Sequence, residues 1–220
     1  MICAPLGDSW RSAVVKTMVV WGLCVAGIAA MPAQAAELEA DGARLHVTGT
    51  LDGESAAAFA EQLAGGQVRT VVFEDSTGGS FEVAEGYAQA IRRASASTEV
   101  RGMCHDACAY AFLAGREHRF GRGLHVNSLL VPLRTRTTAA DIEKTLVEFR
   151  TPPAVPAAGS APAPTREPWL PAQGLLFTAT PTLFGRIYNS YWCDGTQGRD
   201  PSKCALLSDA DPYKLGVLTP

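Results

Sequence analysis

The residues best suited to chemistry stand together in the segment "CHDAC", which holds Cys104, His105, Asp106 and Cys108. Apolar runs flank this segment, so we expect it to form the turn from a buried strand into a buried helix. Many hydrolases carry their nucleophile at such a turn, where free N–H groups can bind a developing anion. Here a carboxylate, Asp106, stands where a serine would be useful.

Asp106 has two interpretations. In the first, it is a helix N-cap, because aspartate accepts the free N–H groups of a first helical turn and its charge suits the helix dipole. In the second, it is a nucleophile or an acid/base group in altered chemistry. A helix N-terminus should lower the pKa of Asp106 and so weaken it in that role. The sequence therefore favours a capping, non-catalytic Asp106.

Other side chains offer weaker routes to catalysis. Cys104 or Cys108 could be a thiol nucleophile with His105 or His125 as its base, although a disulfide is the more common state of exported cysteines. Loop serines usually satisfy backbone groups, and this is the interpretation we give to Ser76, Ser80 and Ser128. His118, in the charged segment "GREHRF", is expected to face solvent.

The cysteines predict disulfides. Cys193 and Cys204 flank a polar loop rich in turn residues, which favours pairing them with each other. Cys104 and Cys108 are then the remaining pair, or they stay as buried thiols. Neither pair has the spacing typical of structural zinc, so no metal site is predicted.

The first 35 residues are expected to be a signal peptide. Arg11 and Lys16 precede an apolar run over 17–31, and Ala33 and Ala35 occupy the small-residue positions of a cleavage site. An uncleaved anchor is the alternative, but the run is shorter than the roughly 20 residues that a span needs. We therefore predict a periplasmic or secreted protein, residues 36–220, that is not held in a membrane.

Composition excludes one class of partner. The formal net charge is −3 at pH 7 and the basic residues are scattered along the chain, so no nucleic-acid surface is predicted.

Apolar periodicity predicts alternating strands and helices, and therefore a single α/β domain with a mostly parallel sheet. Strands are expected over 44–51, 68–74, 98–104 and 124–133, and helices over 52–66, 81–94, 109–115 and 138–149. Thr138 with Asp141 is expected to cap the last helix. The Pro/Ala-rich segment 151–171 is expected to be a flexible insertion, either a lid or disordered. The apolar stretch that follows must pack on the same core.

The order of these motifs resembles the Clp protease proteolytic subunit family and its exported relatives, within the ClpP/crotonase-like superfamily. The resemblance runs from about Leu45 to Val131 and is carried by "STGGS" at 76–80, "CHDAC" at 104–108 and "FLAG" at 112–115. It implies a single ClpP/crotonase-like domain of repeated β-β-α units, with no cofactor.

The resemblance also implies roles for particular residues. Asp106 occupies the nucleophile position, and the base position falls on Asn127 or, with a small shift, on His125. The oxyanion donors would be the backbone N–H groups of Gly79 and Ala107, in a binding loop that includes Gly78. The serine and histidine of the family are replaced, so the expected protein is inactive. It would act as a peptide-binding or scaffold module, with a homo-oligomer possible. The alternative is an active hydrolase with a non-standard nucleophile.

Overall fold

The computed structural model describes residues 35–136, 138–151, 169–197 and 200–220. The predicted signal peptide, 1–35, lies outside the described residues except for Ala35. The same holds for the predicted insertion, 151–171, except for Thr151 and residues 169–171.

A nine-stranded mixed sheet forms the centre of the described part. Its strand order is β1-β2-β3-β4-β6-β7-β8-β9, and β5 pairs with β4. The strands are β1 (Glu37–Asp41), β2 (Arg44–Thr50), β3 (Thr70–Thr77), β4 (Ser97–His105), β5 (His118–Phe120), β6 (Asn127–Pro132), β7 (Gln173–Thr182), β8 (Gly185–Asp194) and β9 (Ala205–Leu206).

The α/β class is confirmed, but the sheet is not mostly parallel. Pairing is parallel only among β2, β3, β4, β5 and β6. The pairs β1–β2, β6–β7, β7–β8 and β8–β9 are antiparallel. Short turns join β1 to β2 and β7 to β8, and a strand that follows a short turn must run back against its neighbour. The connection between β6 and β7 is longer and contains α4.

Four helices accompany the strands. They are α1 (Gly53–Ala64), α2 (Phe81–Ala94), α3 (Ala107–Phe112) and α4 (Ala139–Arg150), with a 3-10 turn at Pro201–Lys203. Thr138 and Asp141 form the predicted capping box at the start of α4. Ser80 caps α2, which has the predicted bounds and ends where Ser95 turns left-handed at φ 50°.

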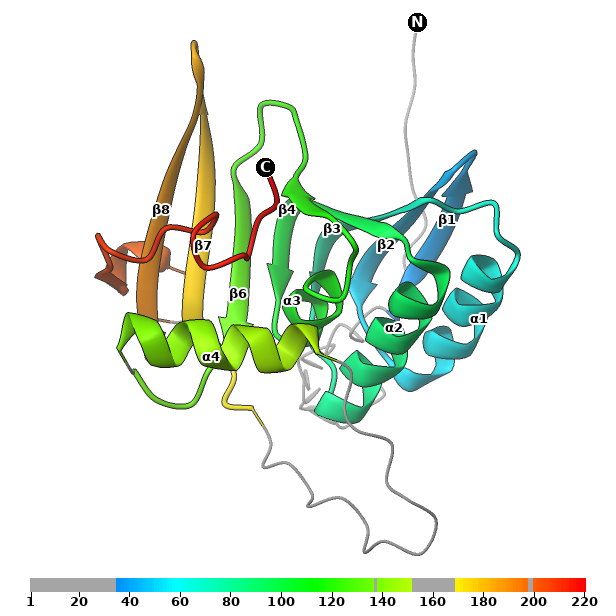
Figure 1. Cartoon of the computed structure of the whole chain (residues 1–220), viewed down its shortest axis with the longest axis horizontal. Coiled ribbons are helices and arrows are strands. Elements are labelled where there is room, and N and C mark those ends of the chain that lie inside the picture. The colour runs from blue at the N-terminus through cyan, green and yellow to red at the C-terminus, as the bar shows by residue number, and fades with distance from the viewer. Residues whose placement is uncertain (1–34, 137, 152–168, 198–199) are drawn as a thin grey trace, which may run out of the picture. The chain divides into compact units, whose positions relative to one another are not determined.

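Four strand–helix units follow one another along the described chain, where the resemblance implied repeated β-β-α units. Two have the β-β-α form, namely β1–β2–α1 and β5–β6–α4, and the two between them are β3–α2 and β4–α3. The helices lie on one face of the sheet (Figure 1).

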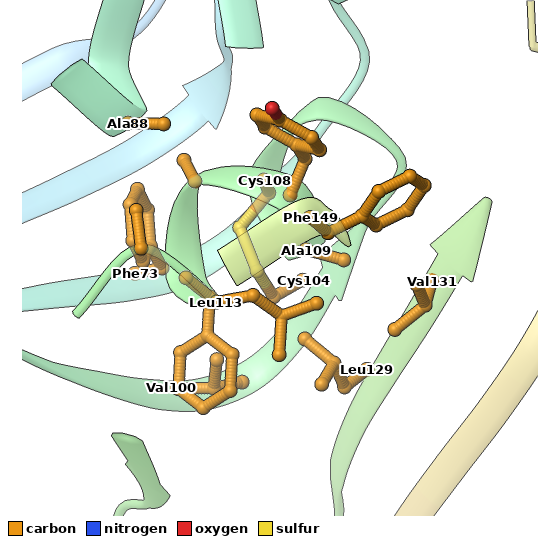
Figure 2. Packing of buried hydrophobic residues seen from close by; sticks show 14 of the residues in the cluster. Phe73, Ala88, Val100, Cys104, Cys108, Ala109, Leu113, Leu129, Val131 and Phe149 are labelled. Carbon is orange, nitrogen blue, oxygen red and sulfur yellow. A yellow bond between two sulfur atoms is a disulfide. The ribbon is translucent and has the colours of Figure 1, made fainter. Parts of the chain in front are cut away.

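The core lies between the sheet and these helices. Every residue of α3 is buried, as its uniformly apolar sequence predicts. Figure 2 shows Cys104 bonded to Cys108 between Val100 and Leu129 of the strands and Phe149 of α4. Cys104 therefore faces the core, and since side chains alternate along a strand, its neighbours Met103 and His105 face the other side of the sheet.

His118 is buried, not exposed as the charged sequence around it suggested. It belongs to β5, and the C-terminal segment covers it, with Nδ1 bonded to the Val217 carbonyl oxygen at 2.9 Å. Only 4% of the residue is exposed. Burial lowers the pKa of His118 to about 4.

Candidate functional site

A cleft of about 540 Å³ lies on the sheet face opposite the helices, where β3, β4, β6, β7 and β8 come together. Its lining residues are Asp75, Thr77, Met103, His105, Asp106, Ser128, Leu130, Pro171, Ala172, Leu176, Cys193, Gln197 and Cys204. The residues from β4 and from β6 stand at alternate positions, as the pleat of a strand requires. The cleft thus joins segments that are distant in the sequence.

Asp106 lines this cleft and does not cap α3. Its backbone has φ 56° and ψ −115°, and its side chain makes no capping hydrogen bond. The N–H of Asp106 donates to the Leu130 carbonyl oxygen at 3.1 Å, which fixes the turn against β6. The capping interpretation is therefore wrong, because the Asp106 side chain accepts no N–H group of the first turn of α3.

The carboxyl group of Asp106 lacks the partners expected of it. Its Oδ1 atom is buried, and none of the described residues forms a hydrogen bond with it. Burial raises the pKa of Asp106 to about 6, the opposite of the lowering expected from a helix N-terminus. The reason is that no described donor bonds to the Asp106 carboxylate. The free-energy cost of removing this charged group from water therefore determines the direction of the pKa shift.

The Gly-Gly loop packs against the start of α3, as predicted. Gly78 and Gly79 have φ values of 75° and 88°, and a Cβ on Gly79 would lie 2.7 Å from the Ala107 Cβ. However, the Ala107 N–H donates to the Gly78 carbonyl oxygen at 3.1 Å. One of the two predicted oxyanion donors is therefore already bonded within the loop.

Neither candidate for the base position lines the cleft. Asn127 is 2% exposed, and its side chain is used at both ends: Oδ1 accepts from the Gly102 N–H at 3.0 Å and Nδ2 donates to the Gly121 carbonyl oxygen at 2.9 Å. His125 is exposed in the loop before β6 and lines a separate hollow with Arg101 and Arg122. The structure places Asn127 in a structural role and His125 in a neighbouring hollow that shares Asp75 with the cleft.

A histidine–serine pair stands beside Asp106 instead. His105 Nε2 and Ser128 Oγ lie 3.2 Å apart, within hydrogen-bond distance, and both residues line the cleft. Burial lowers the pKa of His105 to about 4, so the ring is neutral at pH 7. The sequence signal for this pair was strand alternation, since Met103 pairs with Ser128 and His105 with Leu130 in adjacent parallel strands. Ser128 was interpreted together with serines in or near loops, although it lies within the predicted strand 124–133.

Both predicted disulfides are confirmed. Cys104–Cys108 lies in the core and Cys193–Cys204 lies in the wall of the cleft, with Cα–Cα distances of 5.2 and 4.6 Å. Within the described ranges, no group of three or more His, Cys, Asp or Glu side chains could hold a metal ion. No helix within those ranges has the length and apolar character needed to span a membrane.

Large apolar side chains are exposed at the end of the β7–β8 hairpin. Leu183 and Phe184 are 95% and 100% exposed, and Leu124, in the loop before β6, is 91% exposed. Arg186 joins the two segments by donating to the Gly123 and His125 carbonyl oxygens. Figure 1 shows this hairpin extending past the neighbouring strands. A homo-oligomer remains a prediction.

Comparisons with known proteins add a likeness over part of the chain. No family model and no curated protein sequence matches it. Among solved structures, an enoyl-CoA hydratase from Polaromonas sp. JS666 is 17% identical, with 44% of this chain and 51% of that chain covered and a TM-score of 0.31. DspI from Pseudomonas aeruginosa is 14% identical, with 44% and 48% covered and a TM-score of 0.32. A probable enoyl-CoA hydratase/isomerase from Mycobacterium abscessus is 13% identical, with 50% of each chain covered and a TM-score of 0.31. The chain thus matches about half the length of each.

Replacing Asp106 by asparagine should stabilise the protein at high pH. The folded-state pKa of Asp106, about 6, lies above the usual value for an aspartate, so the fold favours the protonated form. The contribution of Asp106 to stability is fully present below about pH 4 and is lost as the pH rises through about 6. At about pH 8, Asp106→Asn should raise the free energy of unfolding by about 2 kcal/mol, after a discount for the part of the side chain that water reaches.

Urea unfolding near pH 8 and near pH 4 measures this effect. The gain should be largest near pH 8 and close to zero near pH 4. Asp209→Asn, at an exposed position outside the cleft, is the matched control and should change little at either pH. An equal gain for Asp106→Asn at both pH values would contradict the prediction.

Proposed function

We propose that this protein is an exported, non-catalytic module of the ClpP/crotonase-like type that binds a peptide in the cleft. The observation that carries the proposal is the state of the predicted nucleophile turn: a carboxylate occupies it, and the Ala107 N–H is bonded to the Gly78 carbonyl oxygen. Acyl transfer requires a nucleophile and free donors where negative charge develops. Asp106 beside a bonded donor would repel an oxyanion.

Export is supported by the cysteines. Both disulfides lie in the described part of the chain, and disulfides of this kind persist in oxidising compartments such as the periplasm or the extracellular space. The same bonds close the thiol route to catalysis, because neither Cys104 nor Cys108 keeps a free thiolate.

Ligand binding is supported by the walls of the cleft. Leu130, Leu176 and the Cys193–Cys204 disulfide form a small apolar cluster there, with Tyr191 packed against it. A few polar groups, including Asp106 and Ser128, line the same space. Apolar walls with a small number of placed polar groups are typical of ligand pockets.

Labelling with a fluorophosphonate probe, measured by intact mass, tests the absence of catalysis. An activated serine oxygen displaces fluoride and gains the phosphonyl group. We expect no adduct on the native protein, and an adduct there would overturn the proposal and identify the nucleophile. An Asp106→Ser variant is treated in parallel. An adduct on this variant alone would show that Asp106 is what silences the site.

A hydrolase that uses Ser128 is the second candidate. The observation in its favour is the 3.2 Å contact between Ser128 Oγ and His105 Nε2 in the wall of the cleft. Against it, a histidine with a pKa of about 4 is a weak base. The same probe separates the candidates, because this hydrolase would give an adduct on the native protein that disappears in Ser128→Ala.

A further inference from the structure

The cleft has a one-sided charge. Among its described lining residues the acidic side chains are Asp75 and Asp106, and there is no lysine or arginine. Asp75 Oδ1 accepts from the Met103 N–H at 3.0 Å, so this carboxylate is already partly bonded. His105 is neutral at pH 7 and does not offset the negative charge. A cleft lined by charge of one sign attracts ligands of the opposite sign.

In this cleft, Asp106 Oδ1 is an acceptor that has no hydrogen-bond partner among the described residues. Its Oδ1 is buried, and no described residue donates to it. A buried acceptor in this state carries an unfavourable free energy that a donor from a ligand would remove. The backbone at φ 56° is a conformation that non-glycine residues rarely adopt, and such strain is concentrated at functional sites.

Apolar surface lies directly beside this carboxylate. The Asp106 N–H is bonded to the Leu130 carbonyl oxygen, and Leu130 is the cross-strand partner of Leu176. Both leucines belong to the apolar cluster that includes the Cys193–Cys204 disulfide. A ligand that reaches Asp106 therefore also meets an aliphatic wall.

We propose that the cleft selects a ligand whose ammonium group pairs with Asp106 and whose adjoining apolar group packs against Leu130 and Leu176. This inference rests on the proposed binding function and specifies the chemistry of its ligand. Within a peptide, the ammonium is either the N-terminal α-amino group or a lysine side chain. A charge-assisted hydrogen bond to a buried carboxylate is strong enough to decide between charged and uncharged ligands.

Calorimetric titration of the purified protein at about pH 7.5 with three dipeptide amides tests this inference. Leu-Leu-amide carries an α-ammonium group, N-acetyl-Leu-Leu-amide carries none, and N-acetyl-Leu-Lys-amide carries only a side-chain ammonium. We expect acetylation of Leu-Leu-amide to weaken binding about tenfold or more, the loss of one charge-assisted hydrogen bond. Binding of the lysine compound would identify a side-chain ammonium as the ligand group.

The variant Asp106→Asn should weaken binding of Leu-Leu-amide to the same extent, while Asp209→Asn should leave it unchanged. Asp106→Asn is expected to be more stable than the native protein, so unfolding would not explain the loss. Equal affinity for the acetylated and free compounds would overturn the inference. The same conclusion follows if Leu-Leu-amide fails to bind at about 5 mM. Neither result would alter the labelling outcome that tests the absence of catalysis.

Discussion

Replacing Gly79 by alanine should lower the free energy of unfolding by about 3 kcal/mol. Gly79 has φ 88°, in the region that side chains other than glycine rarely adopt. A Cβ at this position would lie 2.7 Å from the Ala107 Cβ and 3.0 Å from the Leu51 carbonyl oxygen. Neither neighbour is the end of a flexible side chain, so the loop and the start of α3 would have to separate.

Urea unfolding monitored by circular dichroism measures this loss. Gly66→Ala is the matched control, because Gly66 has φ 70° but nothing lies within 4 Å of its added Cβ. The control should lose only the backbone strain, about 1 kcal/mol. If the two variants lost the same amount, close packing of the Gly-Gly loop on α3 would not be what requires glycine at position 79.

Replacing Arg92 by alanine should also lower the free energy of unfolding by about 3 kcal/mol. Arg92 Nη1 donates to Glu85 Oε1 at 3.1 Å, and Arg92 Nη2 donates to the Phe149 carbonyl oxygen at 3.1 Å. Tyr110 OH donates to the other oxygen of Glu85 at 2.6 Å. Because Glu85 is 8% exposed, removal of Arg92 would leave a buried carboxylate without its cation. It would also remove the hydrogen bond that joins α2 to the end of α4.

Arg93→Ala is the control for this variant. Arg93 follows directly on the same helix but is exposed, and within the described residues its hydrogen bond is to Gln89 Oε1. Its replacement should cost no more than about 0.5 kcal/mol. Thermal unfolding of both variants under identical conditions gives the comparison. A loss at Arg93 as large as that at Arg92 would mean that helix propensity, not the buried ion pair, sets the effect.

Features that depend on near neighbours in the chain were predictable from the residues alone. Apolar periodicity gave the bounds of α2, and the pairing of Thr138 with Asp141 gave the start of α4. Close spacing favoured the Cys193–Cys204 disulfide. These features depend on hydrogen bonds and contacts within a few residues, so the types and spacing of the residues are sufficient to predict them.

The burial and the hydrogen-bond partners of the site residues could be seen only in the folded structure. Asp106 was expected to be a helix cap with a lowered pKa. Instead, its N–H is bonded to the Leu130 carbonyl oxygen and the residue lines the cleft, where burial raises the pKa of Asp106 to about 6. The Asn127 side chain is hydrogen-bonded to the backbone of Gly102 and Gly121. His105 lies beside Ser128 because β6 pairs with β4. Burial and hydrogen-bond partners set the chemistry of a polar side chain. Here those partners come from other strands, which local sequence patterns do not specify.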